Sequence, residues 1–81
     1  MDGQVALVRE QRQDFAVLLV KNHVITDPQL REDAQRFGEQ QFGIRTALLA
    51  ENGHIWGPRD IISWLRSVAP WQLPWRQFRT I

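Results

Sequence analysis

The spacing of apolar residues changes from one segment of this chain to the next, and it predicts most of the elements. Residues 15–21, FAVLLVK, are almost continuously apolar and lack the polar stripe of a surface helix. A short run of this kind is typical of a strand that is buried on both faces. Residues 44–50, IRTALLA, have the same character, and we expect a second buried strand there.

A helix is expected between these two strands. Thr26 or Asp27 can cap its first turn, and Pro28 suits a position whose N–H needs no partner. Gly38 either weakens the helix or marks a close approach to the sheet, and Gly43 suits the left-handed residue that ends it. The positions that recur at helical spacing and are predicted to face the core are Leu30, Ala34, Phe37 and Gln41 or Phe42.

A strand, a helix and a strand joined by short loops predict a crossover in which the two strands are parallel. The pair Asn52-Gly53 then predicts a type I′ hairpin turn, with residues 54–56 returning as a short antiparallel strand. Residues 58–69 predict the last helix, which Pro70 would end. Its core-facing positions are expected to be Ile61, Ile62, Leu65 and Val68.

Two segments lie outside this pattern. Residues 1–14 contain β-forming residues near their start, and they are expected to form either an edge strand or an extended arm. Residues 70–81 are rich in Trp, Pro and Arg, and Pro74 disfavours a helix, so we expect an extended or turn-like tail. The whole chain, residues 1–81, is therefore predicted to be one α/β domain of order β(β)αββα, with two helices on a mixed sheet of three to four strands.

Two resemblances add to this picture. The run ALLAENGHIWGPRDIISWLRSV, residues 47–68, resembles the strand, hairpin and final helix of thioredoxin- and glutaredoxin-like domains. The redox motif of those families has no counterpart here, so the resemblance implies a partly thioredoxin-like architecture without redox activity. Segments spread over nearly the whole chain, among them FAVLLVKNHVI and LPWRQF, also resemble a family of small uncharacterised proteins of cyanobacterial type. This second resemblance implies no activity.

Composition narrows the chemistry that the domain can perform. The chain has 81 residues and no cysteine, which excludes disulfides, cysteine-ligated zinc, iron–sulfur clusters and thiol redox chemistry. The longest apolar run falls far short of the roughly 20 residues that cross a bilayer, and residues 1–11 lack the regions of a signal peptide. We therefore expect a cytoplasmic protein that uses no cofactor.

The net charge of +1 is unevenly distributed along the chain. Residues 1–58 hold six Lys and Arg against eight Asp and Glu, whereas residues 59–81 hold four Arg against one Asp. The C-terminal part is thus mildly basic, well short of the charge that is typical of a polyanion-binding domain.

No motif in the chain predicts catalysis or a metal site. His23 and His54 lack a second ligand at metal-binding spacing, and we interpret both as exposed turn residues. Ser63 and Ser67 are expected on the exposed side of the last helix without an oriented base, so we predict that the protein is no enzyme. The start of that helix, with Arg59 beside it, is the best candidate for binding a small anion.

Tryptophan is unusually frequent in this chain, which has four of them. Large rings add core to a small domain, and Trp with Arg also dominates protein interfaces and stacks on nucleic-acid bases. We interpret the tail first as a lid on the core and second as a contact surface. The leading hypothesis is a non-enzymatic protein-interaction or accessory domain that binds a protein partner or a second copy of itself. A nucleic-acid-binding domain and a small-anion-binding protein are the alternatives. The candidate contact residues are Arg59, Arg66, Trp71, Trp75, Arg76 and Arg79.

Overall fold

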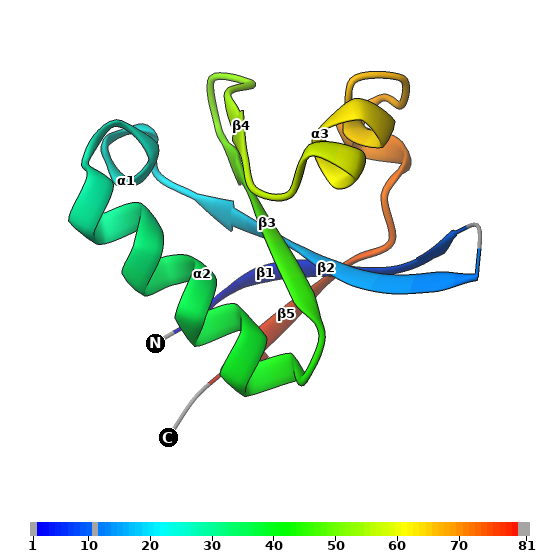
Figure 1. Ribbon diagram of the computed structural model, residues 1–81, viewed down its shortest axis with the longest axis horizontal. Helices are drawn as coiled ribbons and strands as arrows, with labels where there is room; N and C mark the ends of the chain where they lie inside the picture. The colour runs from blue at the N-terminus through cyan, green and yellow to red at the C-terminus, as the bar shows by residue number, and fades with distance from the viewer. Residues whose placement is uncertain (1, 11, 80–81) are drawn as a thin grey trace.

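One mixed β-sheet runs through the molecule, and both of its faces carry helices (Figure 1). The computed structural model describes residues 2–10 and 12–79. The strands lie in the order β4-β3-β2-β1-β5 and are β1 (Asp2–Glu10), β2 (Gln13–Val20), β3 (Arg45–Ala50), β4 (Ile55–Trp56) and β5 (Trp75–Arg79). The helices are α1 (Asn22–Thr26), α2 (Pro28–Phe42), α3 (Arg59–Leu65) and the short 3₁₀ helix η1 (Pro70–Gln72).

The strand pairing confirms the predicted crossover. Strands β2 and β3 are parallel, in a register that pairs Phe15 with Arg45 and Val20 with Ala50. The chain reaches β3 through α1 and α2, as parallel neighbours require. All the other strand pairs are antiparallel. The α/β class is therefore right.

The predicted counts are wrong, because both ends of the chain join the sheet. The described residues form five strands and three α-helices, in place of three to four strands and two helices. Residues 2–10 are neither an edge strand nor an arm, since β1 lies between β2 and β5. The tail takes the edge position instead, and it pairs Trp75 with Ala6 and Phe78 with Gly3. The tail is extended and turn-like as expected, but its place in the sheet was not predicted.

Helix α2 begins and ends as its sequence predicts. The carboxylate of Asp27 accepts hydrogen bonds from the backbone N–H groups of Gln29 and Leu30, at 2.9 and 3.3 Å. Gly43 closes the helix in a left-handed conformation and donates its N–H to the Glu39 carbonyl. Asp27, rather than Thr26, is therefore the cap. Thr26 belongs to α1, a helix of one turn that the sequence did not predict.

Helix α3 is shorter than the predicted span of residues 58–69. It ends at Leu65, and the Ser67 hydroxyl donates to the Trp64 carbonyl at 2.7 Å. A serine that bonds a nearby carbonyl in this way competes with the regular helix ladder. Ile61 and Leu65 are buried as expected, while Ile62 and Val68 are half-buried.

The hairpin forms at the predicted place with a different turn. Gly53 has a positive φ of 95°, but Asn52 does not, so the turn is not type I′. The Gly53 N–H bonds the Ala50 carbonyl, and the Ala50 N–H bonds the His54 carbonyl. A three-residue loop with glycine in the left-handed position fits this pattern. The side-chain oxygen of Asn52 accepts from the His54 N–H at 3.1 Å, which favours the observed loop.

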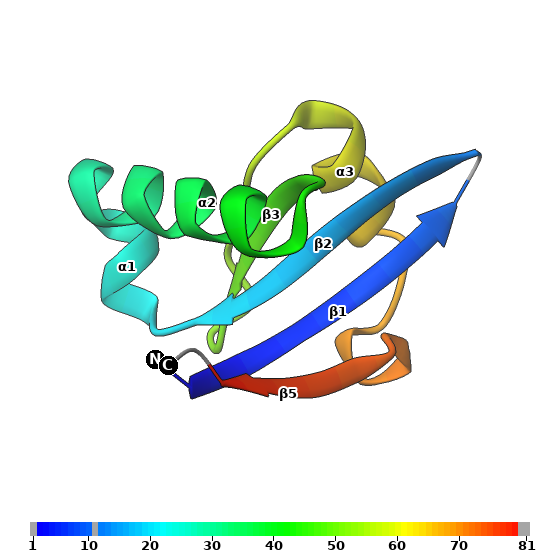
Figure 2. The same ribbon diagram turned by 90° about the horizontal axis from the view of Figure 1, so that it is seen from below.

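The two faces of the sheet each carry a separate core. We call them the α3 face and the α2 face, after the helices that cover them (Figure 2). The buried residues of the α3 face are Ala6, Val8, Phe15, Val17, Ala47, Leu49, Ile61, Leu65 and Leu73. Those of the α2 face are Val5, Ala16, Leu18, Ile25, Leu48 and Ala50.

Candidate ligand groove

Helix α2 touches the sheet most closely at one point. A methyl group added at Gly38 would lie 2.5 Å from Cγ2 of Thr46, a buried residue of β3. The side-chain amide of Gln35 donates to the Thr46 carbonyl at 3.1 Å beside this contact. Gly38 is the only described residue of α2 that is buried. The glycine therefore marks a close approach to the sheet, one of the two readings offered by the sequence.

Beyond this contact, the sheet does not fully cover the apolar side chains of α2. Ala34 and Phe37 are only half-buried, and Leu30 is 39% exposed. Ala34 and Phe37 pack against the buried cluster of the α2 face, as predicted, and together with Leu30 they also line a groove. The reason is geometric: α2 packs on β3 and, more lightly, on β2, so that β1 and β5 have no helix above them on this face.

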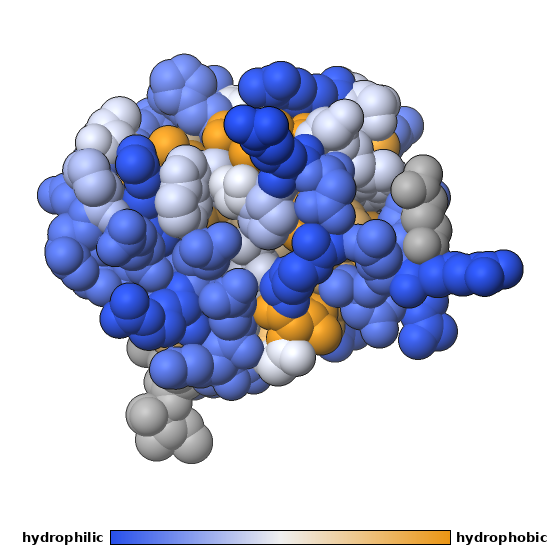
Figure 3. Space-filling model, in the orientation of Figure 1, coloured by the Kyte–Doolittle hydropathy of each residue, from blue (hydrophilic) through white to orange (hydrophobic). Residues whose placement is uncertain are grey.

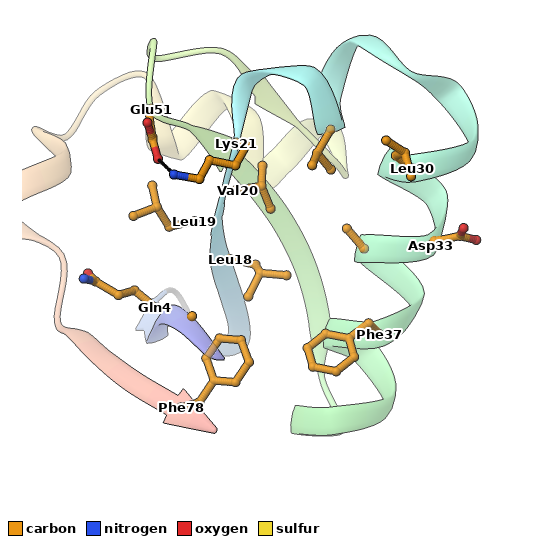
Figure 4. A pocket seen from close by; sticks show the side chains of 13 residues that line it. Gln4, Leu18, Leu19, Val20, Lys21, Leu30, Asp33, Phe37, Glu51 and Phe78 are labelled. Atoms are coloured by element: carbon orange, nitrogen blue, oxygen red, sulfur yellow. Dashed lines mark hydrogen bonds and ion pairs between the residues drawn. The ribbon is translucent and has the colours of Figure 1, made fainter. Parts of the chain in front are cut away.

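The groove has a volume of about 620 Å³ and lies between α2 and the ends of β1, β2 and β5 (Figure 4). Leu18 from β2 points into it, and Phe37 and Phe78 stand on opposite sides of it. Seven of the lining residues have apolar side chains larger than alanine, and the stem of Lys21 adds to them at the mouth: Leu18, Leu19, Val20, Val24, Leu30, Phe37 and Phe78. Ala34 and Gly3 add small residues that leave space.

Aromatic rings close one end of the groove. The ring of Phe78 lies over Gly3, where an added methyl group would come within 2.9 Å of it. The Phe37 and Phe78 ring centroids are 5.9 Å apart, and Phe42 meets Phe78 edge to face at 5.5 Å. Such pairs stabilise beyond their burial by about 0.5–1.5 kcal/mol. This end of the groove is thus built from β5 and the C-terminal half of α2.

Polar groups stand at the mouth of the groove. Lys21 Nζ lies 3.1 Å from the Glu51 carboxylate, with both side chains more than half exposed. Asp33, on α2, accepts a hydrogen bond from the side-chain amide of Gln29 at 2.9 Å. The exposed Gln4 is the remaining polar residue of the lining. The site therefore combines an apolar interior with donors and acceptors at its rim, as small-molecule sites do.

The six residues proposed as contacts from the sequence do not gather around this groove. Arg59 and Arg66 lie at the two ends of α3, and Trp71 lies on η1. Trp75 packs against the core of the α3 face, and its indole N–H donates to the Pro70 carbonyl at 2.7 Å. Strand alternation places Arg76 on the α2 face, beside Phe78, and Arg79 on the α3 face.

The tryptophans fill mostly structural positions. Trp64 is half-buried and meets Phe15 edge to face with centroids 5.3 Å apart. Trp56 lies under the guanidinium of the half-buried Arg31, with 5.2 Å between the ring centroid and Cζ. Trp71, at 82% exposed, is the ring that remains on the surface.

The predicted anion site at the start of α3 is occupied by the protein's own carboxylate. Asp60 accepts two hydrogen bonds from Arg45, at 2.8 and 3.2 Å, and Arg45 also donates to Gln13. The hydrogen bonds from Arg45 lower the pKa of Asp60 below its ordinary value, and they raise the pKa of Arg45. A helix of seven residues gives this position little further pull on an anion.

The sequence predicts that His23 and His54 are exposed turn residues. His23 lies on α1, His54 follows the hairpin turn, and both are exposed. Among the residues that the structure describes, no three His, Asp or Glu side chains gather closely enough to hold a metal ion. Within the same residues, no helix is long and apolar enough to cross a membrane. The view in Figure 3 is mostly polar, with apolar residues showing between the polar ones.

Comparisons with family models, with curated proteins and with solved structures find no match to this chain. The two resemblances drawn from the sequence therefore stay predictions. One feature departs from the thioredoxin-like expectation: the helix after the hairpin is not the last element, because η1 and β5 follow it and β5 joins the sheet beside β1.

The sequence contained half of the signal for the groove. The stripe Leu30, Ala34 and Phe37 predicts a side of α2 that faces the core, as an amphipathic helix usually has. Ala34 and Phe37 do pack there, but the spacing does not predict the open space beside them. The other wall depends on Phe78, whose place follows from the pairing of β5 with β1. No local signal in the sequence predicts this pairing, because Gly3 and Phe78 lie near opposite ends of the chain.

Proposed function

We propose that the protein is a non-enzymatic binding module that holds a small, largely apolar molecule in the groove beside α2. The observation that carries this proposal is the groove itself, a space of about 620 Å³ lined mainly by aliphatic and aromatic side chains. Ligand sites of proteins commonly measure about 300–1,000 Å³ and have this kind of lining. The proposal keeps the non-enzymatic binding role expected from the sequence and moves it from the tail to the α2 face.

The residues at the mouth indicate the chemistry of the ligand. Lys21 donates and Glu51 accepts, and the pair is accessible to solvent. A ligand with an apolar body and one uncharged polar end, such as a hydroxyl or an amide, could bond either partner without leaving a buried charge unpaired. The contacting rings of Phe37 and Phe78 close one end of the groove and offer an aromatic surface against which an apolar group can pack.

The structure favours this role over nucleic-acid binding. A surface for single-stranded nucleic acid needs basic and aromatic side chains on one continuous face. Here Arg76 and Arg79 point to opposite faces of β5, and Trp75 is packed on the core. Among the described rings of the tail, Trp71 is the one that is exposed.

The groove can be tested by filling it. The full-length chain is titrated with the fluorescent probe 1-anilinonaphthalene-8-sulfonate and, in competition, with decanol. Ala34→Phe places a ring between α2 and Leu18, where the groove is open, and should reduce probe affinity at least tenfold. The matched control is Gln40→Phe, which adds the same ring on an exposed position of α2 outside the lining.

The control separates a specific loss from a general one. Gln40→Phe should bind the probe as the unchanged protein does, and thermal unfolding should show that both variants remain folded. Equal probe binding by Ala34→Phe and the unchanged protein would contradict the proposal, as would probe binding that decanol does not compete away.

A further inference from the structure

The outer edge of β5 is the longer open edge of the sheet. Strand β5 spans five residues, whereas β4 at the opposite edge spans two. Among the described residues, no strand pairs with β5 on the side away from β1, and Figure 2 shows this side at the rim of the molecule. An open edge presents unpaired N–H and C=O groups and is a template for pairing with another chain.

The sequence of β5 is self-complementary about its centre. Its residues are Trp75, Arg76, Gln77, Phe78 and Arg79. In an antiparallel pair of two β5 strands centred on Gln77, Arg76 lies opposite Phe78 and Trp75 lies opposite Arg79. Each arginine then lies opposite an aromatic ring, and no arginine lies directly opposite another.

Other registers lose this match. Centring the pair on Arg76 would set two guanidinium groups directly against each other, which destabilises a strand pair. Centring it on Phe78 would leave Trp75 and Arg76 without a partner inside β5. The central register is also the one in which all five residues of β5 are paired.

We propose that the protein forms a two-fold symmetric homodimer in which the β5 strands of two copies pair antiparallel about Gln77. The two sheets then continue into one, with the α2 faces of both copies on the same side. This proposal is independent of the ligand groove, although the two share Phe78, which would have Arg76 of the second copy beside it. The residue at the centre faces its own copy across the symmetry axis, and it is exposed in a single chain.

The symmetry supplies a charge-swap experiment. Gln77→Lys puts two ammonium groups opposite each other, and Gln77→Glu puts two carboxylates there. Sedimentation equilibrium of the full-length chain should show a concentration-dependent dimer for the unchanged protein and at least about fivefold weaker dimerisation for each variant. An equimolar mixture of the two variants should recover dimerisation, because Lys then faces Glu.

Matched controls exclude a general charge effect. Gln72→Lys and Gln72→Glu change an exposed glutamine of η1, outside β5, and should dimerise as the unchanged protein does. Circular dichroism should show that all four variants fold. A monomer at every concentration of the unchanged protein would overturn the proposal. So would two Gln77 variants that dimerise normally, or a mixture that remains monomeric.

Discussion

The two faces of the sheet are covered in different ways. On the α3 face, a helix of seven residues is too short to cover the sheet, and side chains from the loop and tail extend the cover. Leu73 and Trp75 come from the chain after α3, and a smaller hollow of about 250 Å³ remains beside Leu65. On the α2 face, a helix of fifteen residues crosses the sheet, yet it leaves a groove along its N-terminal half.

This difference shows that helix length does not decide how well a face is sealed. The short helix is accompanied by Leu73 and Trp75 from the chain that follows it. The long helix packs on β3 and β2, with its close approach at Gly38, and reaches β5 only through ring contacts with Phe78. The cover of the α3 face therefore serves stability, and the incomplete cover of the α2 face leaves room for a ligand. Each of the following changes tests one side of this contrast.

The largest effect is expected from removing the tail. A chain that ends after Ala69 loses Leu73, Trp75 and the whole of β5, which exposes one side of β1 and opens the α3 face. An 81-residue domain has little stability in reserve. We expect the shortened chain to lose its cooperative thermal unfolding transition, as followed by circular dichroism.

Single substitutions in the tail distinguish a tryptophan that packs on the core from one that is exposed. Trp75→Ala removes core packing and the hydrogen bond to Pro70, and should lower the free energy of unfolding by about 2–4 kcal/mol. Trp71→Ala, at an exposed ring, should change it by no more than about 0.5 kcal/mol. Equal effects of the two substitutions in urea unfolding would show that the tail is not a lid on the core.

A smaller effect is expected where α2 touches the sheet. Gly38→Ala would normally strengthen a helix by up to about 1 kcal/mol. Here the new methyl group would overlap the Thr46 side chain, so we expect a net loss of about 1–2 kcal/mol in the free energy of unfolding. Chemical denaturation with urea measures this loss.

A second substitution, at Thr46, should relieve the overlap that Gly38→Ala creates. Thr46→Ala removes both Cγ2 and Oγ1, the two atoms nearest to the added methyl group. The double variant should therefore recover at least about 1 kcal/mol relative to the sum of the single changes. Strictly additive effects would mean that Gly38 and Thr46 do not limit how closely α2 approaches the sheet.

The contrast between the faces also explains what the sequence could predict. Local signals were sufficient for β2, β3, α2 and the hairpin, because caps, glycines and apolar runs act within a few residues. The ends of the chain could not be placed in this way. The pairing of β1 with β5 joins residues such as Gly3 and Phe78, which lie at opposite ends of the sequence.

The sequence did not predict the groove for the same reason, because the groove depends on contacts between residues far apart in the chain. An apolar stripe shows which side of α2 avoids water, but it does not show how many strands lie beneath that side. The Trp and Arg residues of the tail were predicted as contacts because they are frequent there. The groove is lined mainly by Leu, Val and Phe, whose frequency in the chain gives no such signal. Their arrangement depends on where α2 stops covering the sheet.

The smallest effect concerns the ion pair that joins α3 to the sheet. Hydrogen bonds from Arg45 hold the pKa of Asp60 below its ordinary value, so the folded state favours the ionised carboxylate. This contribution to stability is complete above the pKa of the unfolded chain, about 4, and it is lost as the pH falls through the lower pKa of the folded state. Asp60→Asn should therefore lower the melting temperature slightly at neutral pH and reduce its decline below about pH 4.

Arg45→Met removes the same interaction from the β3 side and should produce the same flatter profile. The double variant should then show the same pH profile as Arg45→Met alone, because that substitution already removes the ion pair, together with the hydrogen bond from Arg45 to Gln13. A profile for Asp60→Asn that falls as steeply as that of the unchanged protein would show that the exposed pair contributes nothing measurable, as many surface ion pairs do. The attachment of α3 would then rest on the apolar packing of Ile61, Trp64 and Leu65. The cover of this face would depend even more on Leu73 and Trp75 of the tail.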